Sequence, residues 1–185
     1  MINRKFFFDY VRGHLFDGKL RQSQVDGLNA ILTEWERKYA KKDDRWLAYM
    51  LATTHHETDR TMQPIEEYGK GKGQTYGVAD SLTGQTYYGR GFVQLTWKSN
   101  YQSMGKKLRV DLVNRPELAL GLKVATRILF QGMMEGTFTG VRLGTYFNPT
   151  KDDWMNARRI INGLDKANLI ATYGKNYYAA ISYTT

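Results

Sequence analysis

The chain contains no cysteine and only three prolines among its 185 residues. The absence of cysteine excludes disulfide bonds, thiolate metal sites and cysteine nucleophiles. Long apolar runs are absent as well, because the run Phe6-Phe7-Phe8 stops at Asp9. That run is too short for a secretion signal, and no stretch approaches the ~20 apolar residues of a membrane span. The composition is compatible with synthesis in a reducing cytosol, and action outside it would require another route of release.

Positive charge is in excess, since 27 lysines and arginines face 18 aspartates and glutamates and give a formal net charge of +9. Such a charge favours a polyanionic partner, either nucleic acid or the anionic bacterial envelope. The basic residues are scattered along the chain instead of forming one basic helix. We therefore expect a charged, solvated surface and no nucleic-acid site.

Hydrophobic periodicity predicts a mainly α-helical chain. Helices are expected over residues 2–15 and 21–40, and from Arg45 into the segment that contains Glu57. Glycines punctuate residues 64–88, which predicts loops and at most a short hairpin there. Further helices are expected to begin near Pro116, Asp152 and Lys166. At this length one domain, residues 1–185, accounts for the whole chain, and we expect a monomer with a cleft in its loop-rich middle.

Glu57 is the first candidate catalytic residue. It lies about two turns beyond Met50, at the edge of the apolar stripe and near the C-terminal end of its predicted helix. Apolar surroundings and the negative end of the helix dipole both disfavour an ionised carboxylate. Cleavage of a glycosidic bond needs a protonated carboxyl, because the leaving oxygen must receive a proton. Position alone favours a solvated glutamate at a helix end.

Two adjacent histidines, His55 and His56, raise the question of a metal site. Neighbouring residues on a helix point about 100° apart, and the zinc-protease pattern of two histidines four apart around a glutamate is missing. His14 is the only other histidine. We therefore predict no metal and no cofactor, and expect His56 to pack or hydrogen-bond beside Glu57.

Hydrolysis of a glycosidic bond with inversion needs a second carboxylate, roughly 6.5–9.5 Å from the first. Glu66 and Glu67 follow the Glu57 helix, and either could face Glu57 across a cleft. Asp59 is too near in sequence to do so comfortably, and Asp80 is a more distant possibility. Of these, Glu67 is favoured.

The most informative segment runs from Tyr87 to Trp97 and reads Tyr-Tyr-Gly-Arg-Gly-Phe-Val-Gln-Leu-Thr-Trp. Two glycines around an arginine suggest a tightly turned backbone that aims side chains into a site. Neutral hydrogen-bonding side chains and flat aromatic rings together suit a carbohydrate. A later Asn162-Gly163 step, read alone, is a helix C-cap.

In this order, these segments resemble glycoside hydrolase family 19, which includes plant-type chitinases and many phage endolysins. The resemblance spans about residues 46–165, and residues 20–32 also resemble the N-terminal helix of the phage enzymes. The segments that carry it are His56-Glu57-Thr58, Tyr88 to Thr96, Asn100-Tyr101 and Ile160-Ile161-Asn162-Gly163.

The resemblance implies a mainly α, lysozyme-like fold with two helical lobes and a loop-rich, slightly β segment that forms the cleft. It makes Glu57 the general acid of an inverting mechanism and gives Thr96 a part in holding the catalytic water. Plant members also carry an arginine after the Asn-Gly step, for which residues 171–178 offer no clear equivalent. The residues expected to contact substrate are His56, Glu66, Tyr88, Arg90, Gln94, Asn100 and Asn162.

The predicted substrate is the glycan strand of peptidoglycan, and the predicted role is that of an endolysin. The compact phage branch, the missing secretion signal and a charge suited to the anionic envelope all favour this prediction. We expect lysozyme-type cleavage on the muramic-acid side. The protein would stay in the host cytoplasm until a holin opens the membrane, and would then act on the cell wall in the periplasm. The alternatives are a chitinase, since chitin shares the β-1,4-linked N-acetylglucosamine, and a non-catalytic carbohydrate-binding protein.

Overall fold

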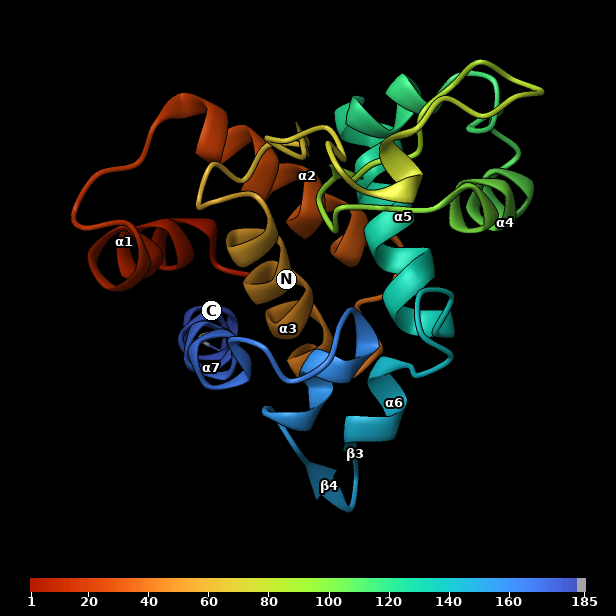
Figure 1. The fold of residues 1–185 in the computed structure, drawn as a ribbon. Coiled ribbons are helices and arrows are strands. Elements are labelled where there is room, and N and C mark those ends of the chain that lie inside the picture. The colour runs from red at the N-terminus through yellow and green to blue at the C-terminus, as the bar shows by residue number, and fades with distance from the viewer. Residues whose placement is uncertain (183–185) are drawn as a thin grey trace.

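The computed structural model describes residues 1–182, which are mainly helical (Figure 1). The α-helices are α1 (Arg4–Leu15), α2 (Gln22–Lys38), α3 (Asp44–Glu57), α4 (Lys98–Leu108), α5 (Leu122–Glu135), α6 (Leu143–Tyr146) and α7 (Ala167–Ser182). Short 3-10 turns are η1 (Thr75–Gly77), η2 (Pro116–Leu120) and η3 (Asn156–Ile160). Two-residue strands form antiparallel pairs, β1 (Ile65–Glu66) with β2 (Arg90–Gly91) and β3 (Phe147–Asn148) with β4 (Lys151–Asp152).

Helix α3 forms the centre of the hydrophobic core. Every residue from Leu47 to His55 is buried, and a helix that is buried on all sides must be covered by neighbours all round. Helix α7 packs along α3 and against α1, while α2 and α5 also contact α3 (Figure 1). The side chain of Asp43 accepts a hydrogen bond from the Arg45 amide at 3.0 Å and caps the start of α3. The candidate acid Glu57 is therefore the last residue of the best-buried helix.

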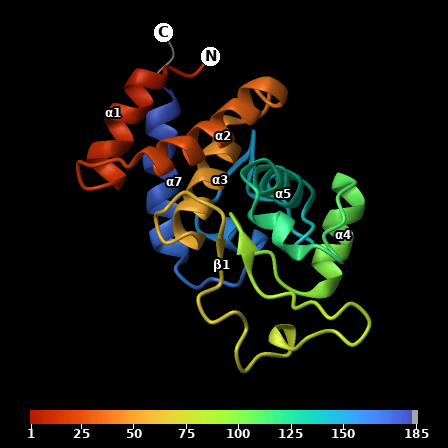
Figure 2. The same cartoon turned by 90° about the horizontal axis from the view of Figure 1, so that it is seen from above.

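The helices form two groups, as the predicted fold class requires. Helices α1, α3 and α7 lie on one side, and α4 and α5 lie on the other (Figure 2). The long loop between β1 and β2 extends away from the helices (Figure 2). Its base is closed by the pairing of Ile65 with Gly91 and of Glu66 with Arg90. None of the helices within residues 1–182 is long and apolar enough to cross a bilayer.

The expected helices over residues 2–15 and 21–40, and those from Arg45 and near Lys166, are confirmed within a few residues. The prediction of an α-helix beginning near Asp152 is wrong. Strand β4 ends there, and the Asp153 carboxylate then accepts the Asn156 amide at 3.0 Å. Such side-chain capping favours a turn, and here it opens the 3-10 segment η3.

Near Pro116 the structure also differs from the predicted helix. The proline begins the 3-10 turn η2, and α5 begins only at Leu122. Gly121 lies between them with an extended backbone, φ −69° and ψ 127°. That conformation separates η2 from α5.

The buried histidine His55 predicts an acid-sensitive core. Burial lowers its pKa from 6.5 to about 3, so the folded protein holds it neutral. The unfolded chain takes up a proton below pH 6.5, and the stability that His55 contributes is lost as pH falls from 6.5 toward 3, by up to about 1.4 kcal/mol per pH unit. We expect the free energy of unfolding of His55→Phe to fall less steeply with decreasing pH over this range. Urea denaturation at several pH values measures the slope, and an unchanged slope would contradict the prediction.

Candidate active site

A cavity of about 350 Å³ opens at the C-terminal end of α3, against the segment that leads into α4. The segment after η3 and the turn after α5 close its other sides. Polar groups make up much of its wall, with Phe138 and Ile161 as apolar parts. The lining residues are Glu57, Tyr76, Val93, Gln94, Leu95, Thr96, Trp97, Asn100, Phe138, Ile161 and Asn162.

The carboxyl of Glu57 lies in this cavity and is paired with Arg158. The Glu57 Oε1 atom is 2.6 Å from Arg158 Nη1, and the two side chains are 14% and 4% exposed. Arg158 Nε also donates to the carbonyl of Asp165 at 3.1 Å, so two bonds orient the guanidinium. Arg158 fixes the carboxyl in one orientation toward the cavity.

Three further predicted residues, Gln94, Thr96 and Asn100, line the same cavity and are held by local hydrogen bonds. Gln94 Nε2 donates to the Ile65 carbonyl at 3.1 Å, and Asn100 Nδ2 donates to the Thr96 carbonyl at 2.9 Å. The hydroxyl of Thr96 donates to the Gln94 carbonyl at 2.7 Å. Asn162 is exposed at the rim. The structure therefore brings Glu57 and four neutral polar side chains into one cleft.

Tyr88, Arg90 and Glu66 do not line the cavity, in contrast to the contacts predicted from the sequence. Arg90 is 5% exposed, lies 3.7 Å over the Tyr88 ring and donates to the Tyr101 hydroxyl at 3.0 Å. The Tyr88 hydroxyl donates to Glu66 at 2.6 Å. The Arg90 guanidinium is attracted to the faces of the Tyr88 and Tyr101 rings. Because Arg90 Nη1 also donates to the Thr86 carbonyl at 3.0 Å, it supports the turned backbone of this segment.

Glu66 is held by neighbours that keep it ionised. The Tyr88 hydroxyl and the Lys70 ammonium, 2.9 Å away, hold the pKa of Glu66 below its usual range. Glu67 takes a different environment, accepting from the Gly89 amide at 3.1 Å and from the Tyr76 hydroxyl at 3.2 Å. Because Tyr76 lines the cavity, Glu67 is one hydrogen bond away from it.

The two histidines have different surroundings. His55 is 1% exposed in the core, and its Nδ1 lies 3.0 Å from the Tyr177 hydroxyl. His56 is half-buried beside Glu57 but does not line the cavity. Burial lowers the pKa of His56, so a neutral imidazole stands next to the catalytic candidate.

Sequence reasoning missed Arg158, Tyr76 and Trp97. Arg158 is a charged residue that follows the apolar residues Trp154 and Ala157 at helical spacing. A charge in such a pattern was the available signal for a buried partner. Trp97 is the last residue of the informative segment, and its aromatic ring was the available signal. Tyr76 lies in the glycine-rich loop, where the linear pattern does not indicate which side chains turn inward.

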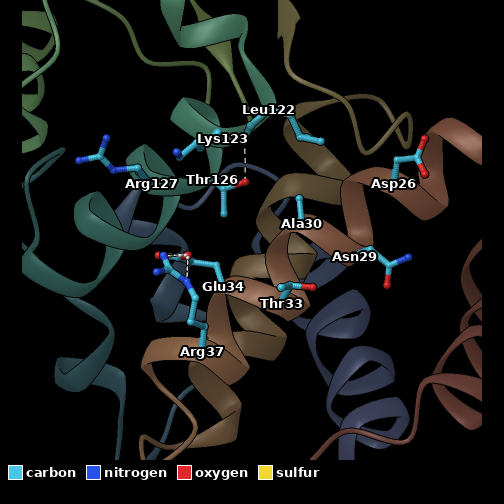
Figure 3. A pocket seen from close by; sticks show the side chains of 10 residues that line it. All are labelled: Asp26, Asn29, Ala30, Thr33, Glu34, Arg37, Leu122, Lys123, Thr126 and Arg127. Carbon is cyan, nitrogen blue, oxygen red and sulfur yellow. Dashed lines mark hydrogen bonds and ion pairs between the residues drawn. The ribbon is translucent and has the colours of Figure 1, made fainter.

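A larger cavity of about 510 Å³ lies elsewhere, between α2 and α5 (Figure 3). Its side chains come from those two helices, and an ion pair between Arg37 and Glu34, 2.6 Å apart, lies along its α2 side (Figure 3). None of the predicted site residues lines this cavity. The smaller cavity at Glu57 is therefore the candidate active site.

Comparison with known proteins connects this site to a family. The family model described as chitinase class I of glycoside hydrolase family 19 matches residues 39–134, just over half of the chain. An acidic endochitinase of Petunia hybrida is 39% identical over 71 residues, which cover 38% of this chain and 27% of that protein. The chain spans less than a third of the length of the curated relatives that it matches.

Solved structures show the same fold. Chitinase C from Streptomyces griseus HUT6037 superimposes with a TM-score of 0.67 at 21% identity, over 100% of this chain and 78% of that one. A bacterial family 19 chitinase gives a TM-score of 0.61 at 20% identity, over 99% of this chain and 96% of that one. These likenesses confirm the predicted mainly helical fold class. The matched family model, which covers over half of the chain, shows that the chain belongs to glycoside hydrolase family 19.

Proposed function

We propose that this protein hydrolyses β-1,4 glycosidic bonds in the glycan strands of bacterial peptidoglycan, with Glu57 as the general acid. One observation carries the proposal: the Glu57 carboxyl lies in a cleft whose other polar groups are neutral amides and hydroxyls. Such groups bind sugar hydroxyls and acetamido groups without requiring charge on the ligand. Family membership supports the same class of reaction.

The reaction that fits this site adds one water across the bond. Glu57 gives its proton to the glycosidic oxygen, which leaves with the electron pair of the C1–O bond. A water oxygen attacks C1 from the opposite face while a second carboxylate takes the water's proton. The Thr96 hydroxyl donates a hydrogen bond to the Gln94 carbonyl, so the lone pairs of its oxygen remain free to accept a hydrogen bond from that water.

Glu67 is the second carboxylate that we propose, acting as the general base. Neither Glu66 nor Glu67 lines the cavity, but Glu67 accepts a hydrogen bond from the cavity-lining Tyr76 whereas Glu66 is paired with Lys70, and this contact supports Glu67. We expect Glu67→Gln to lower kcat about 10²-fold or more with KM within a few-fold. Glu66→Gln is the matched control and should retain most of the activity. Reducing-end release at saturating substrate measures both, and a larger loss in Glu66→Gln would overturn the assignment.

We propose peptidoglycan as the substrate and host-cell lysis, as an endolysin, as the biological role. A net charge of +9 supports binding to an anionic cell wall. The protein would remain in the host cytoplasm until a holin lesion releases it, act as a monomer, and cut on the muramic-acid side. Chitin is the second candidate, favoured by the names of the relatives, which are chitinases and endochitinases.

The deciding experiment incubates wild-type protein and Glu57→Gln with purified Gram-negative sacculi and, in parallel, with colloidal chitin. New reducing ends and new free amines are counted, and mass spectrometry identifies the bond that is cut. Reducing ends from sacculi, absent with Glu57→Gln, would support the proposal. Reducing ends from chitin alone would make the protein a chitinase, free amines would mean an amidase or peptidase, and binding without product would leave a carbohydrate-binding protein.

A further inference from the structure

The larger cavity, between α2 and α5, takes no part in the chemistry at Glu57. Its volume of about 510 Å³ lies within the ~300–1,000 Å³ that is typical of small-molecule sites. Ala30 on α2 and Thr126 on α5 both line it, and these small side chains leave the space between the two helices open (Figure 3). Among the described residues, none lines both this cavity and the cleft at Glu57. The α2–α5 cavity is therefore separate from the cleft.

One side of the α2–α5 cavity carries positive charge without a balancing carboxylate. Lys123 is exposed on α5, and Arg127 follows about one turn later. Arg127 Nη2 donates to the Leu108 carbonyl at 2.7 Å, which holds the guanidinium at the cavity. Within residues 1–182, neither of these two cations forms an ion pair with a carboxylate. Both are available to an anionic group of a ligand.

The opposite side of the cavity carries a carboxylate. Figure 3 shows Asp26 across the cavity from Lys123 and Arg127. Asp26 is exposed, its Oδ1 atom accepts from Gln22 Nε2 at 2.8 Å, and it forms no ion pair in the described part of the chain. The other carboxylate of the cavity, that of Glu34, is balanced by ion pairs of 2.6 and 2.8 Å with basic residues of α2. Unpaired charges of opposite sign thus face each other from the two helices.

Neutral groups between these charges can pair with peptide bonds. Thr126 is 4% exposed, and its hydroxyl donates to the Leu122 carbonyl at 2.8 Å, so its oxygen keeps lone pairs that accept from an N–H group. Asn29 Oδ1 accepts from Arg4 Nη1 at 3.4 Å, which leaves the Asn29 amide nitrogen to donate to a carbonyl. The cavity therefore offers both partners that an amide group needs.

The charges decide which class of ligand fits. A polyanion such as nucleic acid or a phospholipid surface would be repelled by the Asp26 carboxylate. A neutral sugar would give no role to the two cations on α5. A peptide with carboxylates and a free ammonium fits both sides, because its carboxylates pair with Lys123 and Arg127 while its ammonium pairs with Asp26.

We propose that the α2–α5 cavity binds short acidic peptides with a free amino group, which is the chemistry of the stem peptides on peptidoglycan strands. The inference rests on the proposed function, since it assigns a second component of the same wall. Because the cavity and the cleft are separate, one can hold a peptide while the other holds sugars. Two attachments to one polymer raise the effective concentration of cleavable bonds at the cleft.

The test measures binding of a soluble peptide, N-acetyl-L-alanyl-γ-D-glutamyl-meso-diaminopimelate, which carries carboxylates and a single free ammonium. Calorimetry compares wild-type protein with Lys123→Glu and with Lys175→Glu. Lys175 is exposed on α7 and does not line the cavity, so the control makes the same change in net charge. We expect Lys123→Glu to weaken binding about three- to tenfold, because repulsion replaces attraction, and Lys175→Glu to stay within about twofold of wild type.

Asp26→Asn tests the opposite side of the cavity. It should weaken binding of the peptide, whose ammonium loses its partner. It should not weaken binding of the same peptide with that amino group acetylated. Equal effects of Asp26→Asn on the two probes would contradict the proposed contact between Asp26 and the ammonium.

The remaining outcomes separate this site from its rivals. Equal weakening in Lys123→Glu and Lys175→Glu, or no peptide binding by wild-type protein, would overturn the site. Binding of duplex DNA or anionic phospholipid vesicles that exceeds peptide binding and is lost in Lys123→Glu would assign the cavity to a polyanion instead. Peptide binding that depends on Lys123, in a protein that releases no reducing ends, would support the site and reject the proposed function. Release of reducing ends from sacculi without peptide binding would do the reverse.

Discussion

Glu57→Gln is expected to lose about 10²- to 10⁴-fold in kcat, the range over which a general acid contributes. The amide cannot give a proton to the leaving oxygen, but its oxygen can still accept the hydrogen bond from Arg158 Nη1. Substrate binding should therefore change little, and the loss should appear in kcat with KM within a few-fold. Initial rates of reducing-end formation over a range of substrate concentrations separate the two parameters.

Glu117→Gln is the matched control for this substitution. Glu117 is 57% exposed on η2 and pairs only with Arg115 among the described residues, so its loss should leave kcat unchanged. Circular dichroism would confirm that both variants keep their helices. Retention of more than a tenth of the wild-type kcat by Glu57→Gln would show that another group donates the proton.

Arg158→Met is expected to reduce activity about 10²-fold, because it removes the group that orients the Glu57 carboxyl. Small misplacements of a reacting group have costs of this size. The substitution also leaves a mostly buried carboxylate without its partner, which should lower the free energy of unfolding by about 2 kcal/mol or more. Activity assays and urea denaturation measure the two effects separately.

Arg159→Met is the control, since Arg159 is exposed on the same turn η3 and does not contact Glu57. Lysine at position 158 should rescue little, because an ammonium on a flexible stem cannot reproduce the bonds from Nη1 to Glu57 and from Nε to the Asp165 carbonyl. The double variant Arg158→Met/Glu57→Gln should recover stability without activity, as the unpaired charge is then gone. Full activity in Arg158→Met would mean that Glu57 needs no orienting partner.

The sequence predicts the fold class well, and several of the residues that it singles out line one cavity, because both features depend on local patterns. The apolar stripe leading to Glu57 is continuous, so the end of α3 follows from periodicity. Gln94, Thr96 and Asn100 lie within a few residues of one another, and a single turned segment places all of them in the cleft. Their roles in catalysis and binding remain predictions.

The sequence predicts less well which polar side chains of a motif line the cavity. Arg90 occupies the middle of the most distinctive segment, yet its guanidinium is enclosed by Tyr88 and Tyr101. Nothing in the linear pattern distinguishes a charged residue that supports a turn from one that contacts a ligand. The same limit applies to Glu66, whose partners Lys70 and Tyr88 are brought to it by the pairing of β1 with β2.

Contacts between distant segments lie beyond local pattern altogether. Arg158 and Glu57 form their hydrogen bond although they lie 101 positions apart in the chain. Only the packing of η3 and α7 against the core brings the two side chains together. The resemblance implies an arginine after the Asn-Gly step, but the arginine that contacts Glu57 in this structure comes before that step.

The burial of α3 beneath α7 has a consequence for when activity can arise during synthesis. Helix α3 is complete once residue 57 has been made, but the helix that covers it ends at Ser182. Contacts of such long range form late, because a long loop must close before they contribute. A nascent chain on the ribosome would thus hold Glu57 on an uncovered helix without Arg158, and hydrolytic competence should appear only after the segment that forms α7 has emerged and docked.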